Sequence, residues 1–171
     1  VSTTLTHLGD ILVALGRADE ALELHQRALD VVQRLAEECP EKLEWQRELA
    51  IRLQRVAQAH ALRGSVEPLK ELSARLGAVL ADIAARAPDH AEWGRMRAQV
   101  LCDVAGYLEQ AGAPEEGARL RAQALAAQED LVARHPDMPD AQRELSVMLN
   151  AHAERERVAG RLPEAQALYT R

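Results

Sequence analysis

The residue types that bind metals or act as nucleophiles are sparse in this sequence and stand far apart. The two cysteines, Cys39 and Cys102, are 63 residues apart and form no CxxC pair, which is typical of reduced thiols in a cytosolic protein. Six histidines are present, but no two lie three or four residues apart and no HExxH motif occurs. Because metal sites need clustered ligands, the sequence predicts no metal and no cofactor.

Candidate catalytic groups also lack the neighbours that would activate them. The sequence contains no GxSxG motif and no phosphate-binding P-loop, and Ser65, Ser73 and Ser146 have no evident His–Asp partners. Asp103 directly follows Cys102, and a neighbouring carboxylate disfavours the thiolate that a cysteine nucleophile needs. We therefore predict that this chain is not an enzyme.

The composition indicates which elements must position the remaining polar residues. Of the 171 residues, 47% are hydrophobic but only 2% are aromatic, and there is no Phe. Ala, Leu, Glu, Arg and Gln dominate, and all five are strong helix formers, so we expect an all-α fold with an aliphatic core.

A net charge of −6 disfavours nucleic-acid binding. No apolar run approaches the ~18–20 residues of a membrane span and no signal peptide is visible, so we expect a cytoplasmic location.

An internal repeat of 48 residues organises the chain, because several independent residue types recur at that spacing. Within each period a Gly and a Pro alternate about 24 residues apart, and each is expected to end a helix. Two helices per repeat follow. The columns that keep the period are Gly16, Gly64, Gly112 and Gly160; Pro40, Pro88 and Pro136; Leu5, Leu53, Leu101 and Leu149; and Trp45 and Trp93.

The repeat predicts seven or eight helices in antiparallel hairpins, making about three and a half repeats in one domain, 1–171. The repeats fall at about 1–40, 41–88, 89–136 and 137–171, the last truncated, and we expect the chain to be a piece of a larger protein. Apolar spacing of three and four residues predicts a buried face in the first helix, and an acid after each Pro could cap the next helix. The expected first helices are 2–15, 43–63, 91–111 and 139–159, and the expected second helices are 18–38, 66–87, 114–134 and 162 to the end. The apolar residues expected to be buried in the first helix are Leu5, Leu8, Ile11, Leu12 and Leu15. The acids expected to cap the first helices are Glu41, Asp89 and Asp137.

The first repeat resembles the tetratricopeptide family, whose pattern is matched by Leu8-Gly9, Leu12, Gly16, Glu20-Ala21 and Ala28-Leu29. His25 departs from it, because the family prefers an aromatic residue there. The resemblance implies a right-handed α-solenoid in which small residues such as Gly9 and Ala21 let helices approach closely. The family repeat is about 34 residues long, and the 48-residue period is similar to a long-helix variant found in large bacterial multidomain proteins. Further along the chain, His60 and His152 replace apolar residues, and we expect them to be partly buried.

In this family the first helices of successive hairpins line a concave groove that holds peptides or partner helices. The resemblance places ten residues of this chain on that groove, and their side chains are polar with acids intermixed. The clustered basic side chains that would clamp a carboxylate are absent. The positions are Thr6, Asp10, Gln54, Arg55, Gln58, Cys102, Asp103, Asn150, Glu154 and Arg157.

Repeat architecture without catalytic groups favours a non-catalytic scaffold that binds a protein or peptide through the groove or an edge of the solenoid. Two alternatives remain open. The array could be a regulatory or spacer arm that packs on other domains of its parent protein, such as a nucleotide-binding switch, a protease or a kinase. It could also associate end to end with further copies, because a truncated array exposes an apolar end.

Overall fold

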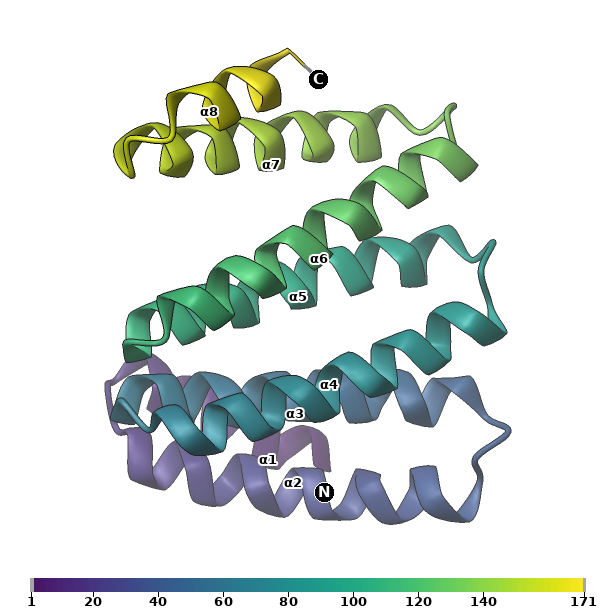
Figure 1. The fold of residues 1–171 in the computed structure, drawn as a ribbon. Helices are drawn as coiled ribbons and strands as arrows, with labels where there is room; N and C mark the ends of the chain where they lie inside the picture. The colour runs from purple at the N-terminus through teal and green to yellow at the C-terminus, as the bar shows by residue number, and fades with distance from the viewer. Residues whose placement is uncertain (1, 171) are drawn as a thin grey trace.

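The computed structural model describes residues 2–170, which fold into eight α-helices that run back and forth along the chain (Figure 1). Each helix packs on the next, so the expected all-α array of antiparallel hairpins is confirmed. The α1–α2 hairpin lies at one end of the array and the α7–α8 hairpin at the other. The helices are α1 (Ser2–Ala14), α2 (Ala18–Glu38), α3 (Leu43–Arg63), α4 (Val66–Arg86), α5 (Ala91–Ala111), α6 (Pro114–Arg134), α7 (Pro139–Val158) and α8 (Leu162–Tyr169).

The helix bounds repeat with the same spacing as the sequence. Helices α2, α4 and α6 begin at residues 18, 66 and 114, and α3, α5 and α7 begin at 43, 91 and 139. The turn inside each hairpin contains a glycine in the left-handed region, with φ of +68° at Gly64 and +95° at Gly112. The Ser65 amide donates to the carbonyl of His60 at 3.0 Å, a pattern that closes the last turn of α3. The predicted glycine caps are confirmed.

The corners between hairpins differ from the sequence-based expectation. Helices α3, α5 and α7 begin after Lys42, His90 and Met138, and none of these residues caps its helix with a side chain. The predicted capping acids Glu41, Asp89 and Asp137 lie one residue too early for that role. The corners are instead braced by the end of a later second helix.

The same kind of brace occurs at two positions that are 48 residues apart. Arg86 at the end of α4 donates to the carbonyls of Pro40 and Glu41, both at 2.8 Å. Arg134, 48 residues later at the end of α6, lies 3.3 Å from Asp89 of the next corner. Each of these arginines therefore ties one hairpin to the corner of the hairpin before it.

The core is aliphatic, as the composition predicts, and runs from α2 through α6. Its most deeply buried large side chains include Leu53, Leu76, Leu80, Val104 and Leu108. Trp45 packs against this core and is half-buried. Burial of such side chains contributes about 1.5–3 kcal/mol each, so stacking of neighbouring hairpins supplies most of the stability.

The predicted buried face of the first helix is wrong for three residues. Leu12 is buried, but Leu8, Ile11 and Leu15 are exposed. The reason is that α2 covers only one side of α1, and no helix of the described residues covers the side on which these three residues lie. The apolar face of α1 is therefore wider than the part of it that α2 covers.

The last hairpin is joined differently from the others. Helices α3 and α5 pack against each other, whereas α5 and α7 stand apart, with α7 resting on α6 and α8. In α7 only Ala141, Leu149 and Ala153 are buried among the described residues, and in α8 only Ala165.

Candidate functional site

Polar side chains link the first helices of the first three hairpins. Arg52 on α3 donates to the hydroxyl oxygen of Thr6 on α1 at 2.7 Å. The Nε atom of Arg55 lies 3.4 Å from the carboxylate of Asp10. Gln54 donates to the carboxylate of Asp103 on α5 at 2.7 Å. We call this set, with Gln58, the polar ladder; its members are Thr6, Asp10, Arg52, Gln54, Arg55, Gln58 and Asp103.

The ladder is partly shielded from water, because its residues are buried or half-buried. Burial raises the pKa of the Asp103 carboxyl, while hydrogen bonds from Gln99 and Gln54 act in the opposite direction. Burial also raises the pKa of Tyr107, and the negative charge of Asp103 adds to that shift. Charged groups in a low-dielectric surface interact more strongly than fully solvated ones. The ladder therefore presents oriented donors and acceptors in a setting where added hydrogen bonds are strong.

His25 forms the floor beneath the α1 end of the ladder. Its ring is fully buried, and its Nε2 atom lies 3.7 Å from a carboxylate oxygen of Asp10. Burial lowers the pKa of His25, while the charge of Asp10 opposes that shift. The ring occupies space that Gly9 leaves open, since a Cβ atom at Gly9 would lie 2.5 Å from the ring carbon Cε1. The departure from the family pattern at His25 is thus accommodated by the small residue opposite it.

The structure brings six of the ten groove residues suggested by the resemblance into the ladder. Asp10, Gln54, Arg55 and Asp103 are joined across three helices, and Gln58 accepts a hydrogen bond of 3.5 Å from Arg55. Thr6 belongs to the ladder as well, but it is buried beneath Arg52 and is not open to a partner.

The other four positions lie elsewhere. Cys102 is on α5, with its sulfur 3.7 Å from Arg121 Nη1 on α6. Glu154 and Arg157 on α7 pair with each other at 2.6 Å, and the Tyr169 hydroxyl lies 3.4 Å from Glu154. Asn150 is exposed on the same helix. These contacts lie outside the ladder.

Two features were missed by the sequence reasoning. Arg52 belongs to the ladder, and Tyr107 lies next to it on α5. The signal for Tyr107 was its position four residues after Asp103, on the same helix face. His60 and His152 are half-buried, as predicted.

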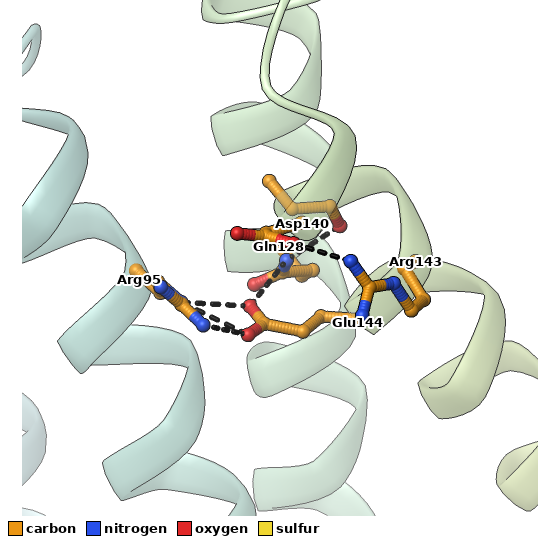
Figure 2. Close-up of polar contacts among 6 residues, drawn as sticks. Arg95, Gln128, Asp140, Arg143 and Glu144 are labelled. Atoms are coloured by element: carbon orange, nitrogen blue, oxygen red, sulfur yellow. Dashed lines mark hydrogen bonds and ion pairs between the residues drawn. The ribbon is translucent and has the colours of Figure 1, made fainter.

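The second missed feature is a separate polar network at α7 (Figure 2). Arg95 of α5 donates to both carboxylate oxygens of Glu144, at 2.9 and 3.1 Å. The buried side chain of Gln128 on α6 donates to the carbonyl of Ala141 at 2.9 Å and lies 3.5 Å from Glu144. Arg143 pairs with Asp140 beside them. Gln128 and Glu144 stand where the preceding repeat has the apolar residues Leu80 and Met96, which is a signal that the repeat alignment contained.

Over residues 2–170, the structure contains no group of three His, Cys, Asp or Glu side chains that could hold a metal ion. No helix in that range is long and apolar enough to cross a membrane.

Residues 1–62 match the model of the tetratricopeptide repeat family. The match covers α1, α2 and nearly all of α3, and the antiparallel packing of the later helices is consistent with repeats of the same kind. No curated protein and no solved structure matches the chain. The fold therefore defines an all-α array of tetratricopeptide-like hairpins.

Proposed function

We propose that this chain is a non-catalytic scaffold that binds a peptide or protein partner along the polar ladder. The carrying observation is that α1, α3 and α5 hold half-buried carboxylate, guanidinium and amide groups side by side through contacts between helices. Tetratricopeptide repeats generally mediate protein–protein interactions. Because the ladder groups are already oriented, a partner that bonds to them loses little conformational entropy from this side.

We also propose that the whole chain is one array of 48-residue hairpins, a long-helix form of the tetratricopeptide repeat. The family match supports this for the first hairpin and most of α3. For the rest, the support is the regular offset of 48 residues between corresponding helix starts. At about 1.5 Å per residue, a helix of 21 residues such as α3 is about 31 Å long, so each such first helix would form a long wall of the groove.

Photo-crosslinking tests the proposed surface directly. A benzoylphenylalanine at Gln58 would lie on the ladder, and the same group at Ala78, exposed on α4, is the matched control. We expect a discrete partner to be captured from Gln58 and not from Ala78, and the additional change Arg55→Ala to reduce that capture. Equal capture from the two positions would contradict the proposal.

End-to-end association is a second candidate, favoured by the exposed face of α1. Leu8, Ile11 and Leu15 lie on successive turns of one side of this helix and are exposed, and an apolar face of this kind is often covered in an oligomer. Sedimentation equilibrium should then show an association that the double change Ile11→Ser and Leu15→Ser abolishes. A wild-type chain that stays monomeric at high concentration would exclude it.

A further inference from the structure

A cleft of about 320 Å³ lies between α5, α6 and α7. The corresponding space one repeat earlier, between α3, α4 and α5, is filled by the apolar core. There Leu80, Val100 and Val104 are almost completely buried. The residues 48 positions later are Gln128, Met148 and His152, and all three line the cleft. The cleft therefore coincides with positions at which polar side chains, including those of Gln128 and His152, replace apolar ones.

One end of the cleft is fixed by the polar network of Figure 2. Arg95 holds Glu144 with hydrogen bonds to both carboxylate oxygens, and Gln128 holds the first turn of α7 through the carbonyl of Ala141. These contacts determine the spacing between α5 and α7. The opening is thus a defined feature of this interface, bounded by satisfied hydrogen bonds.

The other end of the cleft contains an arginine pair that shares one carboxylate. Arg121 has a side chain only 10% exposed, and its Nη2 atom lies 2.6 Å from Glu109. Arg155 approaches the second oxygen of the same carboxylate at 3.9 Å, and its side chain is 47% exposed. One carboxylate cannot neutralise two guanidinium groups, so a positive charge is left over at the cleft mouth. This surplus is local, since the chain as a whole has a net charge of −6.

The walls between these two ends are apolar. Leu125 and Met148 lie in the cleft, and Val147 and Ala151 form its outer lip on α7. Val147 is an apolar side chain that is 63% exposed, whereas the corresponding residue 48 positions earlier is the polar Gln99. An occupant that matches this lining needs an apolar side chain for the walls and a carboxylate for Arg155.

We propose that the cleft between α5 and α7 is a docking site for an acidic, apolar peptide segment. An aliphatic or aromatic side chain of the peptide enters between Leu125, Met148 and Val147. A carboxylate next to it in the peptide pairs with Arg155, which releases Arg121 to pair fully with Glu109. Charge complementarity fixes the acidic character of the segment, and the enclosed apolar volume fixes its anchor residue.

Selection from a displayed library of random peptides tests this site on the full chain. The library is enriched on the wild-type protein and depleted on Ala151→Phe, a change at an exposed position that fills the cleft. We expect the enriched peptides to place Asp or Glu beside a large apolar residue. A synthetic fluorescein-labelled copy should bind about tenfold more weakly to Arg155→Gln and to Val147→Asp, with affinity falling as salt rises. The matched control Arg119→Gln, an exposed change on α6, should bind normally.

Three results would overturn the proposal. They are a selection that yields no peptide sensitive to Ala151→Phe, enriched peptides without acidic residues, and sedimentation showing that a second copy of the chain occupies the cleft. Circular dichroism confirms that each variant is folded, and Val147→Asp serves if Ala151→Phe is not. The ladder is tested separately by Arg55→Ala, so failure of one surface leaves the other unaffected.

Discussion

The interface that α5 makes with α3 and α4 and the interface that α7 makes with α5 and α6 occupy the same places in two successive repeats. At four corresponding positions the first interface has apolar residues and the second has mostly polar ones. The pairs are Leu80 and Gln128, Met96 and Glu144, Val100 and Met148, and Val104 and His152. The first interface is apolar and most of these side chains are almost completely buried, whereas the second is hydrogen-bonded and leaves a cleft.

The difference teaches that each interface of a repeat array has its own strength. Complete burial of a Leu side chain contributes about 1.5–3 kcal/mol, whereas a typical hydrogen bond contributes about 1 kcal/mol net. The closed interface therefore gives stability. The polar interface gives a defined spacing with less stability, so the α7–α8 hairpin is the part of the array that should open most readily.

Exchanging the residues at one such pair should have unequal effects. Leu80→Gln places an amide in a closed apolar interface and removes a core side chain, so it should lower the free energy of unfolding by about 3 kcal/mol. Gln128→Leu loses one hydrogen bond but gains apolar contact, so its effect should be less than about 1 kcal/mol. Urea unfolding followed by circular dichroism measures both variants. Equal losses in the two variants would show that the interfaces do not differ as described.

Glycines in tight and open places give a second test of the contrast. Gly9→Ala drives a methyl group into the buried ring of His25 and should cost about 2 kcal/mol, as overpacking typically does. Gly106→Ala, within α5, meets nothing within 4 Å and should stabilise the protein by about 0.5–1 kcal/mol, because Ala favours the helix. Thermal melts compare the two. A neutral Gly9→Ala variant would mean that His25 moves aside easily.

The glycines in the turns inside the hairpins allow the stability of the last hairpin to be compared with that of the rest of the array. Gly112 and Gly160 both have positive φ, +95° and +78°, so a change to Val strains both turns by about 1–2 kcal/mol. Gly112→Val, and likewise Gly64→Val, should lower the melting temperature of the whole array. Gly160→Val should mainly release the α7–α8 hairpin, which hydrogen exchange resolves residue by residue. An identical fall in global stability for all three would indicate that the array unfolds as one unit.

Helix positions were the most predictable part of this molecule, because Gly and Pro mark both ends of each hairpin in the sequence. The ends of α1 at Ala14, α4 at Arg86 and α7 at Val158 each differ from the expected bounds by one residue. The pairing of Asp10 with Arg55 and of Gln54 with Asp103 could also have been predicted, since the repeat places these residues on adjacent first helices. The hydrogen-bond partners themselves were not predictable, because they depend on side-chain rotamers.

The cleft could not be predicted from the pattern of any single helix. It depends on how closely α7 approaches α5, and that distance is the outcome of several substitutions acting together at one interface. Leu8, Ile11 and Leu15 show the same limit, since periodicity identified an apolar face but could not say whether another helix covers it. Local patterns specify the elements, and the contacts between elements decide which faces are filled.

Buried His25 should make the first hairpin sensitive to acid. Its pKa in the folded state is lowered, chiefly by burial, with Arg52 and Arg55 adding to the shift and Asp10 opposing it. The unfolded chain therefore binds a proton more readily, and stability should fall as the pH drops below about 6.5. Burial also lowers the pKa of His60, so His25→Phe should reduce this acid sensitivity without abolishing it. Melting temperatures at about pH 7.5 and 5.5 measure the difference; an unchanged pH dependence in His25→Phe would assign the effect elsewhere.

Arg95→Ala should give the smallest effect on global stability and the clearest effect on the polar interface alone. The Arg95 guanidinium is largely exposed, so its pairing with Glu144 is screened by water, and the unfolding midpoint should not change measurably. The same pair is nevertheless one of the few contacts that set the position of α7 on α5. Its loss should speed hydrogen exchange in α7 while leaving exchange in α3 unchanged. Arg34→Ala, an exposed change on α2, is the control and should alter neither helix. Faster exchange throughout the array would mean that Arg95 supports the common core, and that the two interfaces are not energetically separate.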